Sequence, residues 1–154
     1  MIAGPPGAGK STLALSVAVL SGVPTLYASM DTHEATMALR TIAMLTGLPQ
    51  MEVENRIKQD PSWASQILAQ KASHITWMFD ASPSLADLAD EVALYREVNG
   101  DNMQLLVVDN MIDVTHDSGD EFSSLRSLAR ELKWWSRDTG AAVLALHHTS
   151  ESYQ

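Results

Sequence analysis

The feature that most constrains the fold is a glycine-rich segment near the N-terminus, Gly4-Pro5-Pro6-Gly7-Ala8-Gly9-Lys10-Ser11. It fits the phosphate-loop pattern G-x-x-x-x-G-K-[ST] at every position. Glycines let the backbone curl, so that successive N–H groups point inward at phosphate oxygens. The loop needs a strand before it and a helix after it, because the helix adds its N-terminal dipole to the phosphate site. The segment therefore predicts a strand–loop–helix unit within an α/β fold.

Each part of this loop has an expected role in holding a nucleoside triphosphate. The Lys10 ammonium group reaches the β- and γ-phosphates, and the Ser11 hydroxyl coordinates Mg²⁺. We expect the nucleotide to contact the loop and the first helical turn, at Gly4, Pro5, Pro6, Gly7, Ala8, Gly9, Lys10, Ser11 and Thr12. The alternative is a glycine-rich turn without a ligand, which the strand and helix patterns on either side disfavour.

Five short β-rich or apolar runs alternate with helical patterns along the chain. The predicted strands are Met1–Ala3, Val23–Ser29, Ile75–Phe79, Gln104–Asp109 and Ala141–Leu146. Strands that alternate with helices form βαβ units, whose right-handed crossovers build a parallel sheet covered on both faces. We therefore predict an α/β fold with a five-stranded parallel sheet, helices on both faces, and a single domain over residues 1–154.

Helix start and stop residues separate these strands. Gly22 ends the first helix, Asp31 or Thr32 caps the second, and Ser84 with Asp87 resembles a capping box. The predicted helices cover residues 10–20, 31–45, one or two segments of 50–72 that break at Asp60-Pro61, 84–99, and a segment around 122–135. The last helix has one apolar face, formed by Phe122, Leu125, Leu128, Ala129, Leu132 and Trp135.

The charge of the chain limits its partners. The formal net charge is −9, whereas a large nucleic-acid surface makes a domain basic, so the acidity counts against strong, autonomous DNA binding. There is no secretory signal and no run near the about 18 apolar residues of a membrane-spanning helix. The chain has no cysteine, which excludes disulfides and thiolate metal sites and agrees with a reducing compartment. We expect a cytoplasmic protein that does not insert into a membrane.

A second residue for Mg²⁺ ends the fourth predicted strand. Four apolar residues precede Asp109, which places this acid at the carboxyl end of a buried strand, where doubly wound sheets bind ligands. In P-loop enzymes such an acid holds Mg²⁺, usually through water; the alternative is that Asp109 only ends the strand. Asn110 follows it, where AAA+ ATPases usually carry the catalytic glutamate. A catalytic base for hydrolysis must therefore come from elsewhere.

Over nearly its whole length, the chain resembles the RecA-like ATPase core of the DnaB-type replicative helicases and their RepA-like relatives. Ser29-Met30-Asp31-Thr32-His33-Glu34, with Arg40 behind it, is similar to the family's S-L-E-M…R segment and has the same Ser-to-Arg spacing. Asp80–Leu85 resembles its D-D-T-P-x-L segment, and Val107–Asn110 stands at its metal-binding strand. Leu146–Ser150 resembles the L-S-Q-L-N of DnaB and, more closely, the H-H-[AT]-S of the RepA-like helicases. The shared order and spacing behind a complete phosphate loop carry the resemblance.

The resemblance implies that Asp31, Glu34 and His148 join Lys10 in catalysis. Asp31 aligns with the glutamate that orients and deprotonates the attacking water, and it is one methylene shorter. Glu34 lies one turn further on as the alternative base; the same pair also fits a helix capping box without a catalytic role. His148 aligns with the glutamine that senses the γ-phosphate, the alternative being an ordinary strand-end histidine. If the strand continues this far, alternation points His147 to the opposite face.

Members of the resembled family also have functional segments for which we find no counterpart in this sequence. The helicases continue past the last strand with an arginine finger and a second DNA-facing loop, whereas this sequence ends at Gln154, and Glu151 stands where they have Lys or Arg. The expected first DNA-facing loop carries no Lys or Arg but the acids Asp113, Asp117, Asp120 and Glu121. The resemblance therefore implies a homo-oligomer or a partner protein that supplies the arginine finger, and single-stranded DNA bound weakly or through a partner.

A basic stripe lies on the last predicted helix, formed by Arg126, Arg130, Lys133 and Arg137, with Trp134 beside it. We interpret the stripe as a solvated helix face and Trp134 as a partly buried residue. The alternatives are contact with DNA, in which Trp134 stacks on a base, or contact across a subunit interface.

Three functions remain open from the sequence. The first, which we favour, is an ATPase: ATP binding and slow Mg²⁺-dependent hydrolysis by a minimal RecA/DnaB-like motor core in DNA replication or recombination. The second is a small-molecule or nucleoside kinase, although Arg56, Lys58 and Lys71 make a poor arginine-rich lid. The third is a non-hydrolysing ATP-binding module that controls assembly. An arginine finger adds about 10³–10⁵ in turnover, so we expect the isolated chain to turn over slowly.

Overall fold

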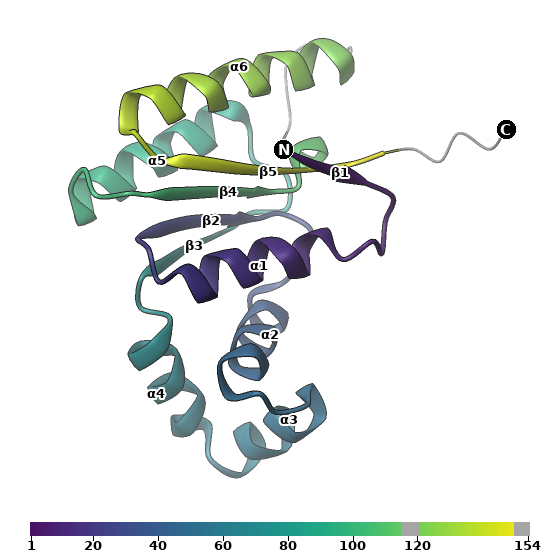
Figure 1. The fold of residues 1–154 in the computed structure, drawn as a ribbon, viewed down its shortest axis with the longest axis vertical. Helices are drawn as coiled ribbons and strands as arrows, with labels where there is room; N and C mark the ends of the chain where they lie inside the picture. The colour runs from purple at the N-terminus through teal and green to yellow at the C-terminus, as the bar shows by residue number, and fades with distance from the viewer. Residues whose placement is uncertain (115–120, 150–154) are drawn as a thin grey trace, which may run out of the picture.

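Strands and helices alternate along the chain in the computed structural model, which describes residues 1–114 and 121–149, without the side chains of 121 and 122. The strands are β1 (Ile2–Gly4), β2 (Thr25–Ser29), β3 (Ile75–Phe79), β4 (Leu105–Asp109) and β5 (Ala142–His148). The helices are α1 (Lys10–Ser21), α2 (Glu34–Thr46), α3 (Gln50–Gln59), α4 (Pro61–Lys71), α5 (Leu85–Asn99) and α6 (Glu121–Thr139), with a short 3₁₀ turn, η1 (Met111–Asp113). Figure 1 shows their arrangement.

The five strands form one sheet in the order β1-β5-β4-β2-β3, and every neighbouring pair is parallel. Helices α5 and α6 cover one face of the sheet, and α1 covers the other (Figure 1). This confirms the predicted α/β fold with a parallel five-stranded sheet and helices on both faces. Because parallel strands share one direction, the carboxyl ends of β1, β2, β4 and β5 meet at the same edge of the sheet.

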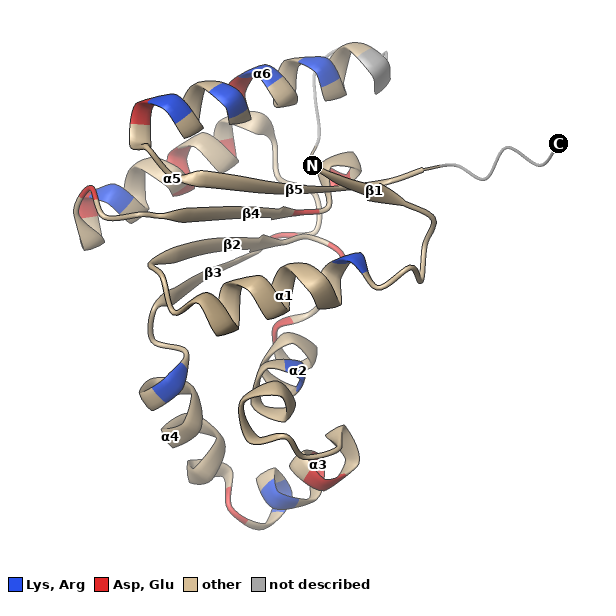
Figure 2. Cartoon of the chain, in the orientation of Figure 1, with Lys and Arg blue, Asp and Glu red and all other residues tan. Residues whose placement is uncertain are grey.

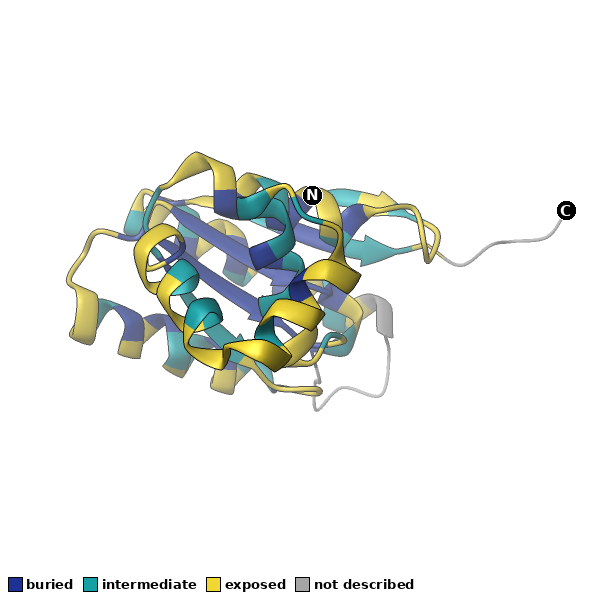
Figure 3. Cartoon of the chain, turned by 90° about the horizontal axis from the view of Figure 1, so that it is seen from below, coloured by how far each residue is buried: buried dark blue, intermediate teal, exposed yellow. Residues whose placement is uncertain are grey.

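The two faces of the sheet bury separate apolar clusters, because successive strand residues point to opposite sides. The cluster under α5 and α6 includes Leu88, Val92, Tyr95, Leu128, Leu132 and Trp135 from the helices and Leu26, Ala28, Leu106, Val108 and Ala145 from the strands. The cluster under α1 includes Ala14, Leu15, Ala18, Val19, Tyr27, Leu105, Val107 and Leu146. Figure 3 shows the buried residues gathered in the sheet, while the outer faces of the helices stay exposed.

Most helix signals in the sequence act as predicted. Gly22 ends α1 in the left-handed conformation, at φ 66°, and Gly47 ends α2 in the same way, at φ 71°. The chain breaks at Asp60-Pro61, where the Asp60 side chain caps α4. Ser84 and Asp87 form the complete capping box that begins α5. These local features set the helix boundaries, and the strands fill the segments between them.

Several element boundaries differ from the prediction by one or more residues, and three of the differences lie at the carboxyl edge of the sheet. Helix α2 begins at Glu34 and is capped by His33, whose Nδ1 accepts from the Ala35 N–H at 3.2 Å. The predicted cap at Asp31 or Thr32 is therefore wrong, because these residues belong to the turn before the helix. Strand β5 ends at His148 instead of Leu146, because its last residues pair with β1, with Gly4 opposite His148. Strand β1 is shifted by one residue from the prediction and ends at Gly4.

The apolar face of α6 is largely as predicted. Leu128, Leu132 and Trp135 are buried, whereas Ala129 is exposed, and the side chain of Phe122 lies outside the described residues. Trp134 on the opposite side is 56% exposed, so the prediction of a partly buried tryptophan does not hold. Among the residues that the structure describes, no helix combines the length and apolar character needed to cross a membrane.

Candidate functional site

The phosphate loop joins β1 to α1 at the carboxyl edge of the sheet. Gly7 and Gly9 adopt φ angles of 77° and 79°, a left-handed conformation in which a side chain is strained. The Gly4 carbonyl accepts from the Thr149 N–H at 3.1 Å, which ties the start of the loop to the end of β5. Helix α1 has no side-chain cap at Gly9, and α3 has none either, whereas side chains cap α2, α4 and α5. Its first backbone N–H groups are therefore open toward a ligand.

Lys10 is the one cation among the buried residues that the structure describes, with 6% of its surface exposed. Its ammonium group donates to the carbonyl oxygens of Gly4 and Pro5, both at 2.8 Å. It also lies 3.1 Å from Nδ1 of His148. Because an ammonium group only donates, Nδ1 of His148 accepts, and the proton of the neutral ring sits on Nε2. The lysine is thus folded back over its own loop.

Ser11 and Asp109 come together from α1 and β4. The Ser11 hydroxyl donates to Oδ1 of Asp109 at 3.0 Å, and the Tyr27 hydroxyl on β2 donates to Oδ2 at 3.0 Å. Asp109 is 1% exposed, and this burial raises the pKa of its carboxyl, against the lowering effect of the two hydroxyl donors. Burial also raises the pKa of Tyr27, followed by the effect of the Asp109 charge, which keeps the phenol a donor.

Sequence analysis did not identify Tyr27 as a site residue. The strand β2 is buried along its whole length, so alternation of polar and apolar residues gives no signal. The register of β2 and β4 supplies the missing information, since Tyr27 pairs with Val107 and Ser29 with Asp109. Tyr27 and Asp109 therefore point to the same face of the sheet, toward α1.

Asp31 and His148 lie together where β2 and β5 end. Oδ2 of Asp31 is 3.9 Å from Nε2 of His148, and Oδ1 of Asp31 accepts from the Thr32 hydroxyl at 2.9 Å. The two side chains are 41% and 28% exposed, so solvent reaches the space between them. The structure thus brings five of the predicted residues into two sets of contacts: Ser11 touches Asp109, and Lys10 touches His148, which faces Asp31.

Glu34 stands apart from these contacts. It is the first residue of α2 and lines a cavity of about 440 Å³ with Asp31 and Thr32. Because His33 caps the helix, the capping-box interpretation of Asp31 and Glu34 is wrong. Asp31 is therefore available for another role at the edge of the sheet.

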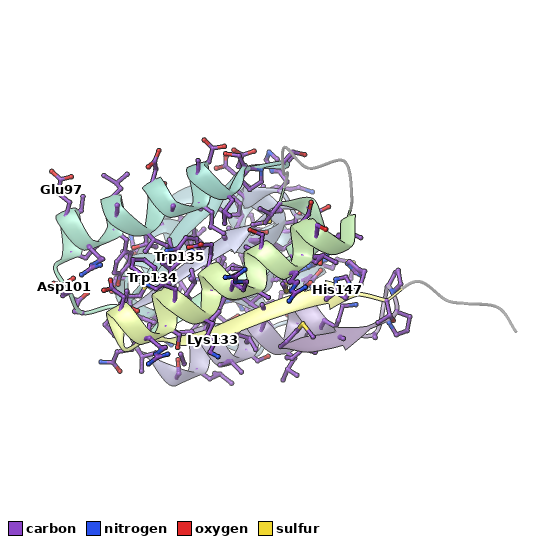
Figure 4. All side chains as sticks on the ribbon, turned by 90° about the horizontal axis from the view of Figure 1, so that it is seen from above. Glu97, Asp101, Lys133, Trp134, Trp135 and His147 are labelled. Atoms are coloured by element: carbon purple, nitrogen blue, oxygen red, sulfur yellow. The ribbon has the colours of Figure 1, made fainter. Side chains whose placement is uncertain are left out.

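The two histidines of β5 point to opposite faces. Strand β5 continues through both, as the alternation argument required, and His148 lies beside Lys10. His147 follows Ala145 onto the α6 side, and its Nδ1 is buried without a hydrogen-bond partner among the described residues. Figure 4 labels His147 on this side of the sheet.

Asp113 is a further acidic residue near the site. It lies in η1, directly after β4. Burial raises the pKa of its carboxyl, and the negative charge of Asp31 raises it further, while His148 lowers it. The expected DNA-facing loop also contains Asp117 and Asp120, which lie outside the described residues. Glu151 lies outside them as well. Within the residues that the structure describes, no three His, Asp or Glu side chains form a metal-binding group, so the candidate for Mg²⁺ is the Ser11–Asp109 pair.

Comparison with known families agrees with this geometry. The model of the family described as AAA domain matches residues 1–153. The chain belongs to the AAA domain family. This AAA domain is 37% identical over 153 residues to the gene 65 protein of Mycobacterium phage D29, covering 96% of the chain and 65% of that protein. It is 34% identical over 148 residues to the gene 65 protein of Mycobacterium phage L5, covering 94% of the chain and 55% of that protein. The AAA domain thus spans more than half, but less than two thirds, of the length of these relatives.

Solved structures show the same fold. A DnaB-like replicative helicase, described with its interactions with primase, has a TM-score of 0.76 at 16% identity, covering 97% of the AAA domain and 38% of that chain. A second structure, described as an ATPase domain, has a TM-score of 0.77 at 16% identity, covering 97% and 56%. The RadB recombinase has a TM-score of 0.57 at 18% identity, covering 98% and 61%. The chain therefore has the RecA-like fold of helicase and recombinase ATPase domains.

Proposed function

We propose that this domain binds ATP with Mg²⁺ at the carboxyl edge of the sheet and hydrolyses it slowly, as a minimal RecA/DnaB-like motor core in DNA replication or recombination. The contact of Ser11 with Asp109, at 3.0 Å and beside the buried Lys10, carries the proposal. Residues of α1 and β4 meet there, and each of the three supplies a group that triphosphate binding requires.

The phosphates are held by the loop and by Lys10. The uncapped N-terminus of α1 offers backbone N–H groups and the positive end of the helix dipole. Lys10 donates to the carbonyl oxygens of Gly4 and Pro5 in the same loop. A β- or γ-phosphate oxygen is a stronger, charged acceptor, so Lys10 moves to it and the loop opens around the triphosphate.

The Ser11–Asp109 pair fits a magnesium ion. Both groups present oxygen, the ligand that Mg²⁺ prefers, and Asp109 is a buried carboxylate with no ion-pair partner among the described residues. When bound, Mg²⁺ neutralises charge on the β- and γ-phosphates. Tyr27 holds the second carboxylate oxygen at 3.0 Å and so fixes the plane of the Asp109 carboxylate.

Asp31 is the proposed base for the attacking water. Its carboxylate accepts the proton as the water oxygen forms the new bond to the γ-phosphorus, and the bond to the β-phosphate oxygen breaks to leave ADP and phosphate. The Nε2 proton of His148 faces this space and can donate to a γ-phosphate oxygen once Lys10 has turned to the nucleotide. Glu34, in the adjoining cavity, is the alternative base.

A second cavity provides room for the nucleoside. It has a volume of about 680 Å³ and adjoins the first turn of α1 at Thr12. Arg40, Met44 and Pro49 line it, which offers a flat guanidinium group and apolar surface to a base. This position agrees with the expected nucleotide contact at Thr12.

The kinase alternative receives less support. The cations expected of a phosphate-binding lid lie in the helical region of α3 and α4, at the end of the molecule below α1 (Figure 2). Arg56 is bonded to Glu52 at 2.9 Å and stacks on Trp63 at 5.6 Å from the ring centre. It is therefore engaged within that region.

Turnover measured against protein concentration tests the proposal. We expect phosphate release from ATP and Mg²⁺ without an added acceptor, slow for the dilute chain, and faster at high concentration or with single-stranded DNA and a partner that supplies an arginine finger. The Lys10→Ala variant removes a transition-state donor and lowers turnover by about 10²–10³-fold. ATP binding without phosphate release under all these conditions would instead select the assembly-module function, and transfer to a nucleoside would select the kinase.

A further inference from the structure

Helices α5 and α6 form the outer layer on one face of the sheet and carry opposite charges. Figure 2 shows mostly acidic charged residues on α5 and mostly basic ones on α6, although each helix also carries residues of the other sign. The acidic ridge of α5 consists of the exposed residues Asp87, Asp90, Leu94, Glu97 and Val98. The basic ridge of α6 consists of the exposed residues Arg126, Arg130, Lys133, Trp134 and Arg137. Each ridge lies opposite the buried side of its helix, so both face away from the sheet.

The basic ridge is unpaired within the described residues. None of its four cations has an ion-pair partner there. Trp134 is 56% exposed and lines a hollow of about 480 Å³ with Arg130, Lys133 and Arg137. The hollow's one acid, Asp138, is already bonded to Arg96 of α5 at 2.8 Å. This surface therefore offers free positive charge and a bare indole ring to a partner.

The acidic ridge offers the complementary set. Asp90 and Glu97 have no ion-pair partner among the described residues. Between and beside them, Leu94 is 50% and Val98 is 72% exposed. The acidic ridge thus has negatively charged side chains next to apolar surface, and the basic ridge has positively charged side chains next to an indole ring. The Arg96–Asp138 ion pair links the two helices, so the ridges form one surface (Figure 4).

We propose that this surface is self-complementary and docks a second copy of the same chain. The two helices run in the same direction, because each leads by a crossover into one of two adjacent parallel strands. A two-fold axis parallel to the helices, between two copies placed face to face, puts α5 of each copy on α6 of the other. Both acid–base contacts then form at once, and Trp134 meets Leu94 and Val98 of the partner. An axis across the helices would put like charges together.

A nucleic acid fits this surface less well. Its phosphates would follow the basic ridge directly beside the acidic ridge, in a chain whose net charge is −9. A second copy meets both ridges with opposite charge. The surface uses residues of α5 and α6 and none of the residues proposed to bind ATP. The proposed dimer is therefore independent of ATP binding at the carboxyl edge of the sheet.

The size of the surface predicts a weak dimer. Two helices side by side, each about 10 Å wide and about 22 Å long over the shared length, present on the order of 400 Å². A standard interface buries about 800 Å² per partner. We therefore expect a dissociation constant of about 10–100 µM that rises with salt, because the contacts are charged and near the surface.

Sedimentation of the whole chain from about 5 to about 500 µM tests the dimer. The Lys133→Glu/Arg137→Glu variant removes the net positive charge of the basic ridge, because Arg126 and Arg130 then face two glutamates, and the Asp90→Lys/Glu97→Lys variant leaves the acidic ridge with more basic than acidic residues. Each variant alone should therefore lose dimerisation by about tenfold or more. Mixed at equal concentrations, the two variants restore a one-to-one dimer, because the unchanged acidic ridge of one variant meets the unchanged basic ridge of the other and no two ridges of like charge are opposed. The Lys58→Glu/Lys71→Glu variant, with the same change in net charge on α3 and α4, keeps the wild-type dimer.

Three outcomes would overturn the proposal. The first is a wild-type chain that stays monomeric over the whole range at low salt. The second is a pair of reversed variants that fold, as judged by circular dichroism, yet do not associate when mixed. The third is binding of an oligo(dT) strand that is lost in Lys133→Glu/Arg137→Glu while self-association is unchanged, which would assign the basic ridge to nucleic acid.

Discussion

The charged side chains at the carboxyl edge of the sheet and those on the outer face of α5 and α6 differ in burial and in their bonding partners. At the edge, Lys10 and Asp109 are buried, and each is held by two or three partners at 2.8–3.1 Å. On the outer face, Lys133 and Arg137 are exposed and have no ion-pair partner among the described residues. The charged groups at the edge are already hydrogen-bonded within the chain, whereas these cations of the outer face have no ion-pair partner among the described residues. Substitutions at the two regions should therefore differ in size and in the property that changes.

The largest effect is expected at Asp31. Asp31→Asn removes the proposed base but keeps the shape of the side chain, so we expect turnover to fall by about 10²–10⁴-fold with little change in nucleotide affinity. Single-turnover hydrolysis and fluorescent-nucleotide binding separate the two quantities. Glu34→Gln is the matched control and should change turnover only a few-fold; the reverse ranking would transfer the role of the base to Glu34.

A smaller effect is expected at His148. His148→Ala removes the proposed donor to the γ-phosphate. A hydrogen bond to a charged group contributes about 1.5–3 kcal/mol, so we expect turnover to fall by about 10–150-fold. His148→Gln keeps a donor and should retain most of the activity. Equal losses in both variants would mean that the imidazole acts by its shape or charge and not as a donor to phosphate.

Tyr27 tests how far the carboxyl edge depends on one hydroxyl group. Tyr27→Phe leaves Oδ2 of the buried Asp109 without its donor, which lowers the free energy of unfolding by about 1–3 kcal/mol. Urea denaturation measures this change. Tyr95→Phe is the control, since Tyr95 is also buried but its hydroxyl has no hydrogen-bond partner among the described residues. Equal destabilisation by the two variants would show that the contact with Asp109 contributes nothing specific.

The smallest effect is expected on the outer face. Lys133→Ala removes an exposed cation without an ion-pair partner among the described residues, so the free energy of unfolding of the dilute chain should change by less than about 0.5 kcal/mol. Thermal unfolding measures this change. A larger loss of stability would mean that the basic ridge stabilises the folded monomer, and the contrast between the two regions would disappear.

Local features of the sequence were enough to predict much of the fold. Gly22, the Asp60-Pro61 break and the capping box of Ser84 and Asp87 each act within a few residues, and each helix boundary that they predicted is present. The last strand was predicted too short, because His147 and His148 are polar and only pairing with β1 extends the strand over them. The order of the strands is a tertiary property that no local pattern in this chain encodes.

The contact between site residues that belong to recognisable sequence motifs was predicted. The pairing of Ser11 with Asp109 follows from the phosphate loop and the apolar strand that precedes the acid. The cap at Asp31 was wrong because Asp31 and His33 are both able to accept from a backbone N–H, and only the path of the chain after β2 selects His33. Tyr27 was missed because its partner is 82 residues away in sequence and the whole strand is buried.

The uncapped start of α1 has a consequence for the lifetime of the folded chain. A side chain caps α2, α4 and α5, whereas α1 and α3 have no side-chain cap, and we propose that in α1 the phosphates of a nucleotide take this place. A ligand that binds only the folded form adds about 2.7 kcal/mol at a concentration of 100 times its dissociation constant. The melting temperature of the domain should therefore follow the nucleotide concentration of its surroundings, and a chain deprived of triphosphate should be the form that unfolds and is degraded first.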